Sequence, residues 1–235
     1  MLPVAILAGG LATRLRPLTE TVPKSMIEIC GHPFAHWQTK QLAKAGVSEI
    51  VYCVGYKSEL IEGFLGDGSK YGLRIRYSHD GLKQLGTGGA IFKALPYLGN
   101  KFMVLYGDSY LPIDYSAIEK QFADCEKPAL MTVYANSGRF DASNVDFSGG
   151  ILNRYQKGMN TREMTHIDYG LSCFDKSVFS EYALDLPLDL AQICTNLASN
   201  NQLAGYEVFE RFYEIGSPQG ILDFKAYIER NLSEL

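Results

Sequence analysis

A glycine pair near the start of the chain is followed by two cations. The chain reads Ala8-Gly9-Gly10 after a short apolar run, and Arg14 and Lys24 come next. Because glycine has no Cβ, backbone N–H groups at this point can come close to a ligand. Backbone donors and fixed cations together suit a polyanion, and we expect that polyanion to be a nucleoside triphosphate.

The elements that would position these residues alternate between strand and helix patterns. Strand patterns cover residues 4–7, 49–54, 73–77 and 102–106, and helix patterns cover 34–45, 58–65 with Ser58 as N-cap, and 86–95. Such alternation predicts βαβ units and a mostly parallel sheet. Ligands of such sheets bind outside the carboxyl ends of the strands. Gly9-Gly10 and Asp108 both follow strands, so we expect them to converge.

The second half of the chain has less regular patterns. Strands are predicted at residues 129–134, 144–147, 151–155, 164–174 and 203–208, and helices at 188–198 and 217–230. Ser148-Gly149-Gly150 is typical of a hairpin turn. We expect one continuous domain over residues 1–235, with a nucleotide-binding half at 1–110 and a second-substrate half at 111–235.

The composition is that of an ordinary soluble globular protein. The 235 residues are 46% hydrophobic and 20% charged, and the formal net charge is −4. Nothing therefore favours binding to nucleic acid or to an anionic membrane. No apolar run approaches the roughly 20 residues of a membrane span, and we see no secretion signal. The five cysteines form no Cys-x-x-Cys pair, which argues against a disulfide framework or zinc site and favours a cytoplasmic protein.

The motif around the glycine pair is longer than a simple turn. The chain carries Gly9-Gly10-x-x-Thr13-Arg14-Leu15-x-Pro17-Leu18-Thr19 and then Pro23-Lys24-x-Met26, and this string resembles the N-terminal motif of the sugar-1-phosphate nucleotidylyltransferases. It lacks the Gly-Lys-Ser/Thr ending of a Walker A loop. The resemblance implies a single Rossmann-like α/β nucleotidyltransferase domain with a mixed, mostly parallel central sheet flanked by helices.

The resemblance also implies roles for the residues of this loop. The backbone of residues 8–10 would hold the base and ribose, with Thr13 in the same nucleotide site. Arg14 would grip the triphosphate near the leaving pyrophosphate, and Lys24 would contact the α-phosphate and the incoming sugar phosphate. These types suit the chemistry, because cations must offset the repulsion between two phosphates as one attacks the other.

Two carboxylates resemble the metal ligands of the family. Asp108, in Gly107-Asp108, matches an Asp that binds Mg²⁺. Glu214-Ile215-Gly216-Ser217-Pro218 matches an Asp-x-Gly-Thr/Ser-Pro string, with Glu in place of the usual Asp. Carboxylate oxygen is the ligand that Mg²⁺ prefers. The same string also predicts a helix start, with Ser217 as N-cap and Pro218 as first residue.

The segment predicted to face the nucleobase is Leu85-Gly86-Thr87-Gly88-Gly89, which resembles a family segment that lies against the base. The residues before it, Asp80 to Gln84, depart from the common family form. Asp80 and Gln84 are the candidates for reading the base, since a carboxylate accepts from guanine N1 and N2 and an amide can pair with purines or pyrimidines. Surface loop residues are the alternative interpretation.

The sugar side is predicted from two weaker matches. Lys157, in Tyr155-Gln156-Lys157-Gly158, resembles a family lysine that binds the phosphate of the sugar, with Gly in place of the usual Pro. Asp168 and Gly170 lie in a segment that resembles one touching the sugar hydroxyls. His32 and His36, by contrast, show no metal-ligand spacing and are interpreted as surface or cap residues.

We therefore predict transfer of a nucleoside monophosphate from a nucleoside triphosphate to a sugar 1-phosphate, with release of pyrophosphate and with Mg²⁺ as cofactor. The branch that the motifs most resemble implies GTP with heptose or mannose 1-phosphate. UTP, dTTP and CTP remain open, as does a phosphocholine substrate. An inactive nucleotide-binding regulatory subunit is the alternative from another class, and a homo-oligomer is possible.

Overall fold

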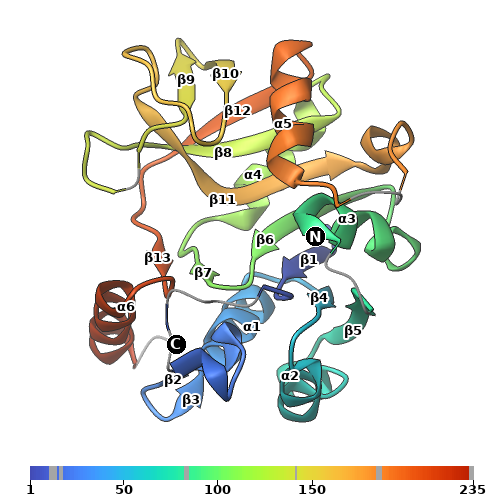
Figure 1. Ribbon diagram of the computed structural model, residues 1–235, viewed down its shortest axis with the longest axis vertical. Helices are drawn as coiled ribbons and strands as arrows, with labels where there is room; N and C mark the ends of the chain where they lie inside the picture. The colour runs from blue at the N-terminus through green and yellow to red at the C-terminus, as the bar shows by residue number, and fades with distance from the viewer. Residues whose placement is uncertain (11–14, 16–17, 82–84, 141, 184–186, 233–235) are drawn as a thin grey trace.

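The computed structural model describes residues 1–10, 15, 18–81, 85–140, 142–183 and 187–232. A mixed sheet runs through its centre with the strand order β10-β9-β11-β6-β1-β4-β5, and β8 pairs with both β11 and β12 (Figure 1). The strands of this sheet are β1 (Val4–Leu7), β4 (Glu49–Val54), β5 (Arg74–His79), β6 (Lys101–Tyr106), β8 (Ala129–Ala135), β9 (Val145–Ser148), β10 (Ile151–Tyr155), β11 (His166–Asp175) and β12 (Leu203–Val208).

Helices and short strands complete the described structure. The helices are α1 (Phe34–Lys44), α2 (Ser58–Leu65), α3 (Gly86–Ala94), α4 (Tyr115–Asp124), α5 (Leu190–Ser199) and α6 (Pro218–Asn231). Two small antiparallel pairs lie outside the main sheet, one formed by β2 (Glu28–Ile29) and β3 (His32–Pro33), the other by β7 (Ser109–Tyr110) and β13 (Tyr213–Glu214).

The amino-terminal strands of the sheet are parallel. β1 pairs in parallel with β4 and β6, and β4 pairs in parallel with β5. Their carboxyl ends therefore lie at one edge, where the loops that follow them meet. β11 is antiparallel to β6 and β8, whereas β12 is parallel to β8. The predicted α/β domain with a mixed central sheet is confirmed, and the division into halves at residue 110 stays a prediction.

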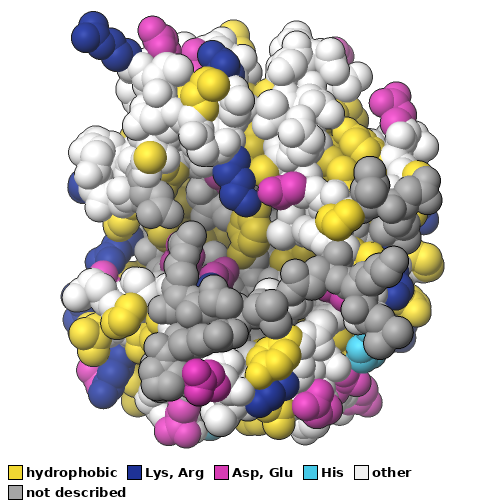
Figure 2. Space-filling model, in the orientation of Figure 1, with side chains coloured by type: hydrophobic (Ala, Val, Ile, Leu, Met, Phe, Trp, Pro, Cys, Tyr) yellow, Lys and Arg dark blue, Asp and Glu magenta, His cyan; other side chains and the backbone are white. Residues whose placement is uncertain are grey.

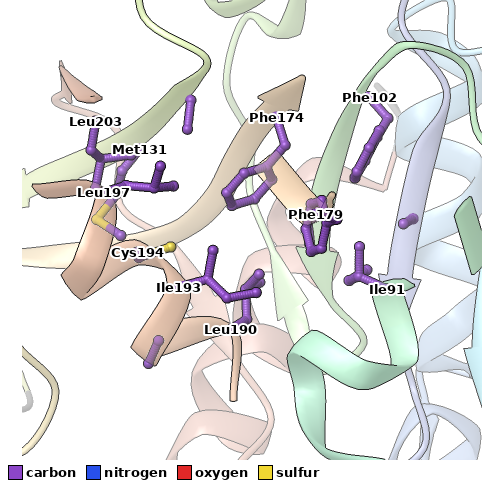
Figure 3. Close-up of a cluster of buried hydrophobic side chains, with 14 of the residues drawn as sticks. Ile91, Phe102, Met131, Phe174, Phe179, Leu190, Ile193, Cys194, Leu197 and Leu203 are labelled. Atoms are coloured by element: carbon purple, nitrogen blue, oxygen red, sulfur yellow. The ribbon is translucent and has the colours of Figure 1, made fainter. Parts of the chain in front are cut away.

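Helices cover both faces of this sheet. On one face α3 and α5 bury apolar side chains against strand residues such as Phe102 and Phe174 (Figure 3). On the other face α1, α2 and α4 pack in a cluster with Val4 and Ile6, whereas Ala5 belongs to the first cluster. Alternate residues of β1 thus contact opposite helical layers, which explains why the strand reads as a continuous apolar run. α6 packs against α1 in a separate cluster.

One helix was not predicted from the sequence. The strands and helices expected above are all present, with ends within two residues of the predicted bounds, but α4 and the short strands β2, β3, β7 and β13 are additional. Its N-cap is Asp114, whose carboxylate accepts hydrogen bonds from the backbone N–H of Ser116 and Ala117. The Asp-x-Ser start was therefore a visible signal, which lay between two stronger strand patterns.

The two predicted helix caps have different outcomes. Ser217 is the N-cap of α6, since its Oγ accepts a hydrogen bond from Gly220 N at 3.0 Å and Pro218 is the first helical residue. Ser58 as an N-cap is wrong. It is the first residue of α2, and the cap position is Lys57, which has a left-handed φ of 54° and makes no side-chain cap bond.

Two further predictions from the sequence concern the cysteines and membrane-spanning helices. All five cysteines are free thiols, and Cys53, Cys173 and Cys194 are buried. No helix in the described ranges is both long enough and apolar enough to cross a membrane.

The start of α3 contacts the segment that leads into α5. Leu188 O accepts hydrogen bonds from Gly88 N at 2.8 Å and Gly89 N at 3.1 Å, and Leu188 N donates to Leu85 O at 2.8 Å. A Cβ at Gly86 would collide with the carbonyl oxygen of Leu188, and φ at Gly86 is +75°. Position 86 therefore requires glycine for both space and backbone conformation.

We expect Gly86→Ala to lower the free energy of unfolding by about 2 kcal/mol or more, because it adds backbone strain to a backbone collision. Urea unfolding followed by circular dichroism measures this. Gly63→Ala is the matched control, since a Cβ there meets nothing within 4 Å and alanine in a helix is favoured over glycine by about 1 kcal/mol. A Gly86→Ala protein as stable as the wild type would contradict the expectation.

Candidate active site

A cavity of about 650 Å³ opens at the carboxyl ends of β1 and β6. Its size is within the range of small-molecule sites. The face shown in Figure 2 is hollowed near its centre, with hydrophobic side chains visible inside the hollow. The lining residues are Leu7, Ala8, Gly9, Gly10, Lys24, Ser25, Asp80, Gly86, Thr87, Ala90, Tyr106, Gly107, Asp108 and Pro187.

Most of the residues predicted from the first half of the chain meet in this cavity. Those that line it are Ala8, Gly9, Gly10, Lys24, Asp80, Gly86, Thr87 and Asp108. Thr13, Arg14 and Gln84 lie outside the described residues. Lys157, Asp168, Gly170 and Glu214 are not among the lining residues, and their positions are described below.

Lys24 and Asp108 form an ion pair at the wall of the cavity. Lys24 Nζ lies 2.6 Å from Asp108 Oδ2, and the two side chains are 24% and 20% exposed. Lys24 begins a short 3₁₀ helix, Lys24–Met26, directly after Pro23. Asp108 follows β6 at the edge of the sheet. The arrangement holds an ammonium and a carboxylate side by side in the wall of the cavity.

Gly107 explains how Asp108 comes so close to the first strand. Gly107 N donates a hydrogen bond to Leu7 O at 2.9 Å. A Cβ on Gly107 would lie 2.7 Å from Leu7 O and 3.1 Å from the Cα of Ala8. Any larger residue would push the two loops apart, so the Gly-Asp pair in the sequence has a steric reason.

Asp80 lies against the glycine loop. Its Oδ2 is 2.9 Å from the position that a Cβ on Gly9 would take. Asp80 N donates to Val54 O, which anchors the residue just beyond β5. Burial raises the pKa of the Asp80 carboxyl, while Lys93 and His79 act in the opposite direction. The carboxylate therefore lines the cavity where the backbone of residues 9–10 also lies.

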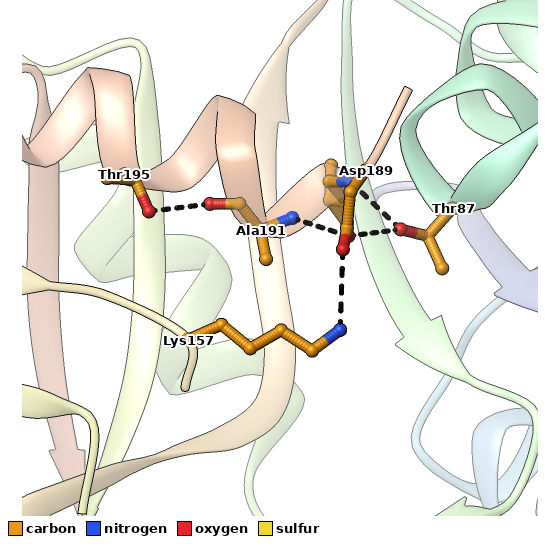
Figure 4. A network of polar contacts seen from close by, with 6 residues as sticks. Thr87, Lys157, Asp189, Ala191 and Thr195 are labelled. Atoms are coloured by element: carbon orange, nitrogen blue, oxygen red, sulfur yellow. Dashed lines mark hydrogen bonds and ion pairs between the residues drawn. The ribbon is translucent and has the colours of Figure 1, made fainter. Parts of the chain in front are cut away.

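A polar network joins α3 to α5 and to the turn after β10 that carries Lys157 (Figure 4). Thr87 Oγ1 donates to Asp189 Oδ1 at 2.8 Å and accepts from Leu190 N at 2.8 Å. Asp189 Oδ1 also accepts from Ala191 N, and Asp189 Oδ2 lies 3.5 Å from Lys157 Nζ. Burial opposes ionisation of Asp189, but these hydrogen bonds and Lys157 hold the pKa of its carboxyl below the usual range.

Asp189 is a residue of this region that the sequence interpretation missed. It caps α5 through its bond from Ala191 N, so an acid directly before a helix was the available signal. Its contact with Thr87 spans 102 positions along the chain, and no local pattern reports such a pairing. Asp189 places the ammonium of Lys157 beside the start of α3, which itself lines the cavity.

Asp168 and Gly170 form a bulge in β11. The register between β11 and β8 shifts between residues 168 and 172, and φ at Gly170 is +105°. Asp168 Oδ1 accepts from Gly170 N at 2.9 Å. Burial raises the pKa of Asp168 to about 6, although the Gly170 N–H and Lys157 favour the ionised form. Gly170 adjoins Tyr106, which lines the cavity: the Tyr106 ring is 3.8 Å from the position that a Cβ on Gly170 would take.

Glu214 is next to Asp108 through the backbone. It pairs with Ser109 between β13 and β7, and Ile215 N donates to Asp108 O at 3.0 Å. The side chain folds toward Gly216, where Oε1 is 2.6 Å from the position of an added Cβ. The two predicted metal ligands thus lie on adjacent segments, and Asp108 is the one of the two that lines the cavity.

The donor set is compatible with a magnesium ion that takes some of its ligands from the protein and the others from a substrate. The described residues contain no group of three or more His, Cys, Asp and Glu side chains that could hold a metal by themselves. Mg²⁺ in nucleotide enzymes is commonly held by one or two carboxylates together with substrate phosphates. Asp108, which lines the cavity beside Lys24, fits that pattern.

Residues 4–231 match the nucleotidyl transferase family. The chain belongs to this family and is a nucleotidyltransferase, as the loop motif predicted. An N-acetylmuramate alpha-1-phosphate uridylyltransferase from Neisseria meningitidis is 43% identical over 113 residues, which are 48% of this chain and 49% of that protein. A D-glycero-alpha-D-manno-heptose 1-phosphate guanylyltransferase from Campylobacter jejuni is 29% identical over 220 residues, 93% of this chain and 96% of that protein.

A solved structure has the same fold. The crystal structure of HddC from Yersinia pseudotuberculosis complexed with GMP-PN aligns with a TM-score of 0.77 at 24% identity, over 97% of this chain and 100% of that one. This likeness supports the arrangement of the mixed sheet and its helices.

We expect Asp168→Asn to change how stability depends on pH. The raised pKa means that the folded state of the wild type binds this proton more tightly than the unfolded state, so stability is lost as pH rises from about 4 through about 6. The unfolding free energy of Asp168→Asn, relative to that of the wild type, should therefore rise by about 1–3 kcal/mol between pH 4 and pH 7.5. Chemical denaturation across this range measures it.

Asp124→Asn, on the exposed surface of α4, removes the same charge and controls for net charge. A difference between Asp168→Asn and the wild type that stays constant from pH 4 to pH 7.5 would contradict the expectation.

Proposed function

We propose that this protein transfers a nucleoside monophosphate from a nucleoside triphosphate to a sugar 1-phosphate and releases pyrophosphate. The observation that carries the proposal is the Lys24–Asp108 pair, with its Nζ to Oδ2 distance of 2.6 Å, in the wall of a cavity bounded by the glycine backbone after β1. Both named relatives act on a sugar 1-phosphate, which supports the substrate class.

The reaction needs no covalent enzyme intermediate. A phosphate oxygen of the sugar 1-phosphate attacks the α-phosphorus, the new P–O bond forms, and the bond to the β-phosphate bridging oxygen breaks. Pyrophosphate leaves with that electron pair. Lys24 exchanges its carboxylate partner for the α-phosphate, and Arg14 holds the leaving pyrophosphate. Each cation offsets negative charge where the two substrates meet.

The cofactor that we propose is Mg²⁺, held by Asp108 with Glu214 contributing from the adjacent segment. When bound, the ion supplies positive charge that neutralises the nucleotide phosphates. The chain contributes by holding the Asp108 carboxylate at the cavity wall. The short separation between Gly107 and the backbone of Leu7 fixes that position.

The second half of the chain supplies the sugar-phosphate site in this proposal. Lys157 binds the phosphate of the sugar, and Asp189 positions its ammonium beside Thr87. Asp168 and Gly170 contact the sugar hydroxyls. The bulge in β11 turns this segment toward Tyr106, which lines the cavity.

GTP with heptose or mannose 1-phosphate is the substrate pair that we propose first. The relative from Campylobacter jejuni, which matches over 93% of this chain, is named for a guanylyl transfer to a heptose 1-phosphate. The Asp80 carboxylate at the cavity can accept hydrogen bonds from guanine N1 and N2. UTP with N-acetylmuramate 1-phosphate is the second candidate, favoured by the 43% identity over 113 residues to the relative from Neisseria meningitidis.

We expect Asp108→Asn to lower the rate of pyrophosphate release by about 100-fold or more, because the site loses both a carboxylate ligand and the partner of Lys24. A coupled pyrophosphate assay with Mg²⁺ measures this. Asp124→Asn makes the same chemical change on the surface of α4 and should leave the rate unchanged. Full activity of Asp108→Asn would remove Asp108 from the catalytic machinery.

A matrix of four nucleoside triphosphates against mannose, heptose and N-acetylmuramate 1-phosphates separates the two candidate substrate pairs. We expect GTP with a heptose or mannose 1-phosphate to give the highest kcat/KM. Asp80→Asn should then weaken GTP use by about tenfold or more, since a hydrogen bond to a charged group contributes about 1.5–3 kcal/mol. A preference for UTP that Asp80→Asn leaves intact would favour the second pair.

A further inference from the structure

A second cavity, of about 590 Å³, shares no lining residue with the one at β1. It is bordered by β3, α1, α2 and a short 3₁₀ helix, Ser69–Tyr71. We call it the basic cavity. The side chains on which its chemistry depends are His32, His36, Lys40, Phe64, Lys70 and Tyr71.

Aromatic rings and ammonium groups both line the basic cavity. The imidazoles of His32 and His36 stack with centroids 4.2 Å apart and planes 17° apart. His36 Nδ1 lies 3.1 Å from the hydroxyl of Tyr71. Lys70 Nζ donates a hydrogen bond to the backbone oxygen of Phe64 and lies 4.1 Å from the centroid of the Phe64 ring. The site therefore offers flat apolar surface directly beside positive charge.

The charge in this cavity is of one sign. Burial, and then the positive charges of its neighbours, lower the pKa of His36 to about 4, and those neighbours are His32, Lys40 and Lys70. Every residue that lines the cavity is described, and none of them is acidic. Repulsion between like charges is thus not offset by a carboxylate in the lining, and a bound anion would offset it.

We propose that the basic cavity binds a small organic phosphate, with the phosphate at Lys40, Lys70 and His32 and an apolar ring against Phe64 and Tyr71. Charge-assisted hydrogen bonds from lysine to phosphate are among the stronger polar contacts in proteins. The volume is that of a small-molecule site. A metal ion suits the cavity less well, because the two imidazoles stack face to face and its lining has no carboxylate.

This site is independent of the reaction proposed above, so its test uses binding and not turnover. The probe is phenyl phosphate, titrated into the wild-type protein without metal and followed by calorimetry and by the NMR signals of the histidine ring protons. Inorganic phosphate and phenol, titrated separately, are the control ligands for the phosphate group and the aromatic ring of the probe. We expect phenyl phosphate to bind at least tenfold more tightly than either part, and the signals of His32 and His36 to shift.

The variant that tests the location is Lys40→Gln with Lys70→Gln. We expect it to weaken phenyl phosphate binding by at least tenfold, since each lost charged contact amounts to about that factor. Lys120→Gln with Lys225→Gln removes two charges from α4 and α6 and is the matched control, with binding within twofold of the wild type. Thermal unfolding of both variants shows whether they fold.

Three results would overturn the proposal. The first is unchanged binding in the Lys40→Gln, Lys70→Gln protein. The second is equal affinity for phenyl phosphate and inorganic phosphate, because the aromatic rings would then contribute nothing. The third is an absence of shifts in His32 and His36 while the probe binds. If the double variant fails to fold, the phenyl phosphate affinity of Lys40→Gln alone is compared with that of Lys120→Gln.

Discussion

The close backbone contact between the loops after β1 and β6 is the constraint on which the site depends. Gly107 N bonds to Leu7 O at 2.9 Å, and a Cβ on Gly107 would lie 2.7 Å from that same oxygen. Only glycine permits this approach. The next residue, Asp108, is thereby held 2.6 Å from Lys24. A wider separation of the two loops would remove the ion pair and leave the carboxylate without its cation.

Each half of the molecule brings a lysine paired with a carboxylate to the region of the cavity. Lys24 and Asp108 are 24% and 20% exposed, whereas Lys157 and Asp189 are 63% and 52% exposed. Ion pairs that are mostly exposed, as Lys157–Asp189 is, contribute only about 0–1 kcal/mol to stability. In the proposed reaction a phosphate would therefore replace Asp189 beside Lys157 at small cost. The pairs also hold both ammonium groups in place before ligand binding, which reduces the side-chain entropy lost on binding.

The sequence predicted that the ends of two strands bring Gly9-Gly10 and Asp108 together, but it did not reveal which side chains pair across the fold. Residues 8–10 and Lys24 belong to one string, and they line one cavity with Asp108, which follows β6 at the same edge of the sheet. Asp189 was missed because its partner Thr87 belongs to another helix. His36 was interpreted as a surface or cap residue, yet it is a half-buried residue of α1 that contacts Tyr71, 35 positions away. Local patterns carry no information about such pairings.

Total charge and local charge act over different distances, which explains how a chain with a net charge of −4 can present sites for anions. Screening at physiological salt limits exposed charges to about 8 Å, so distant carboxylates hardly oppose a phosphate at the cavity wall. The charge that a ligand meets at each cavity is therefore set by the lysines there and by the groups paired with them. At the cavity after β1 the partner of Lys24 is Asp108, whose carboxylate would bind the metal ion in the proposed reaction while Lys24 binds a phosphate. In the basic cavity no lining carboxylate accompanies Lys40 and Lys70, and among the described residues Lys70 donates only to the backbone oxygen of Phe64, so a bound phosphate would displace no charged partner from the lining.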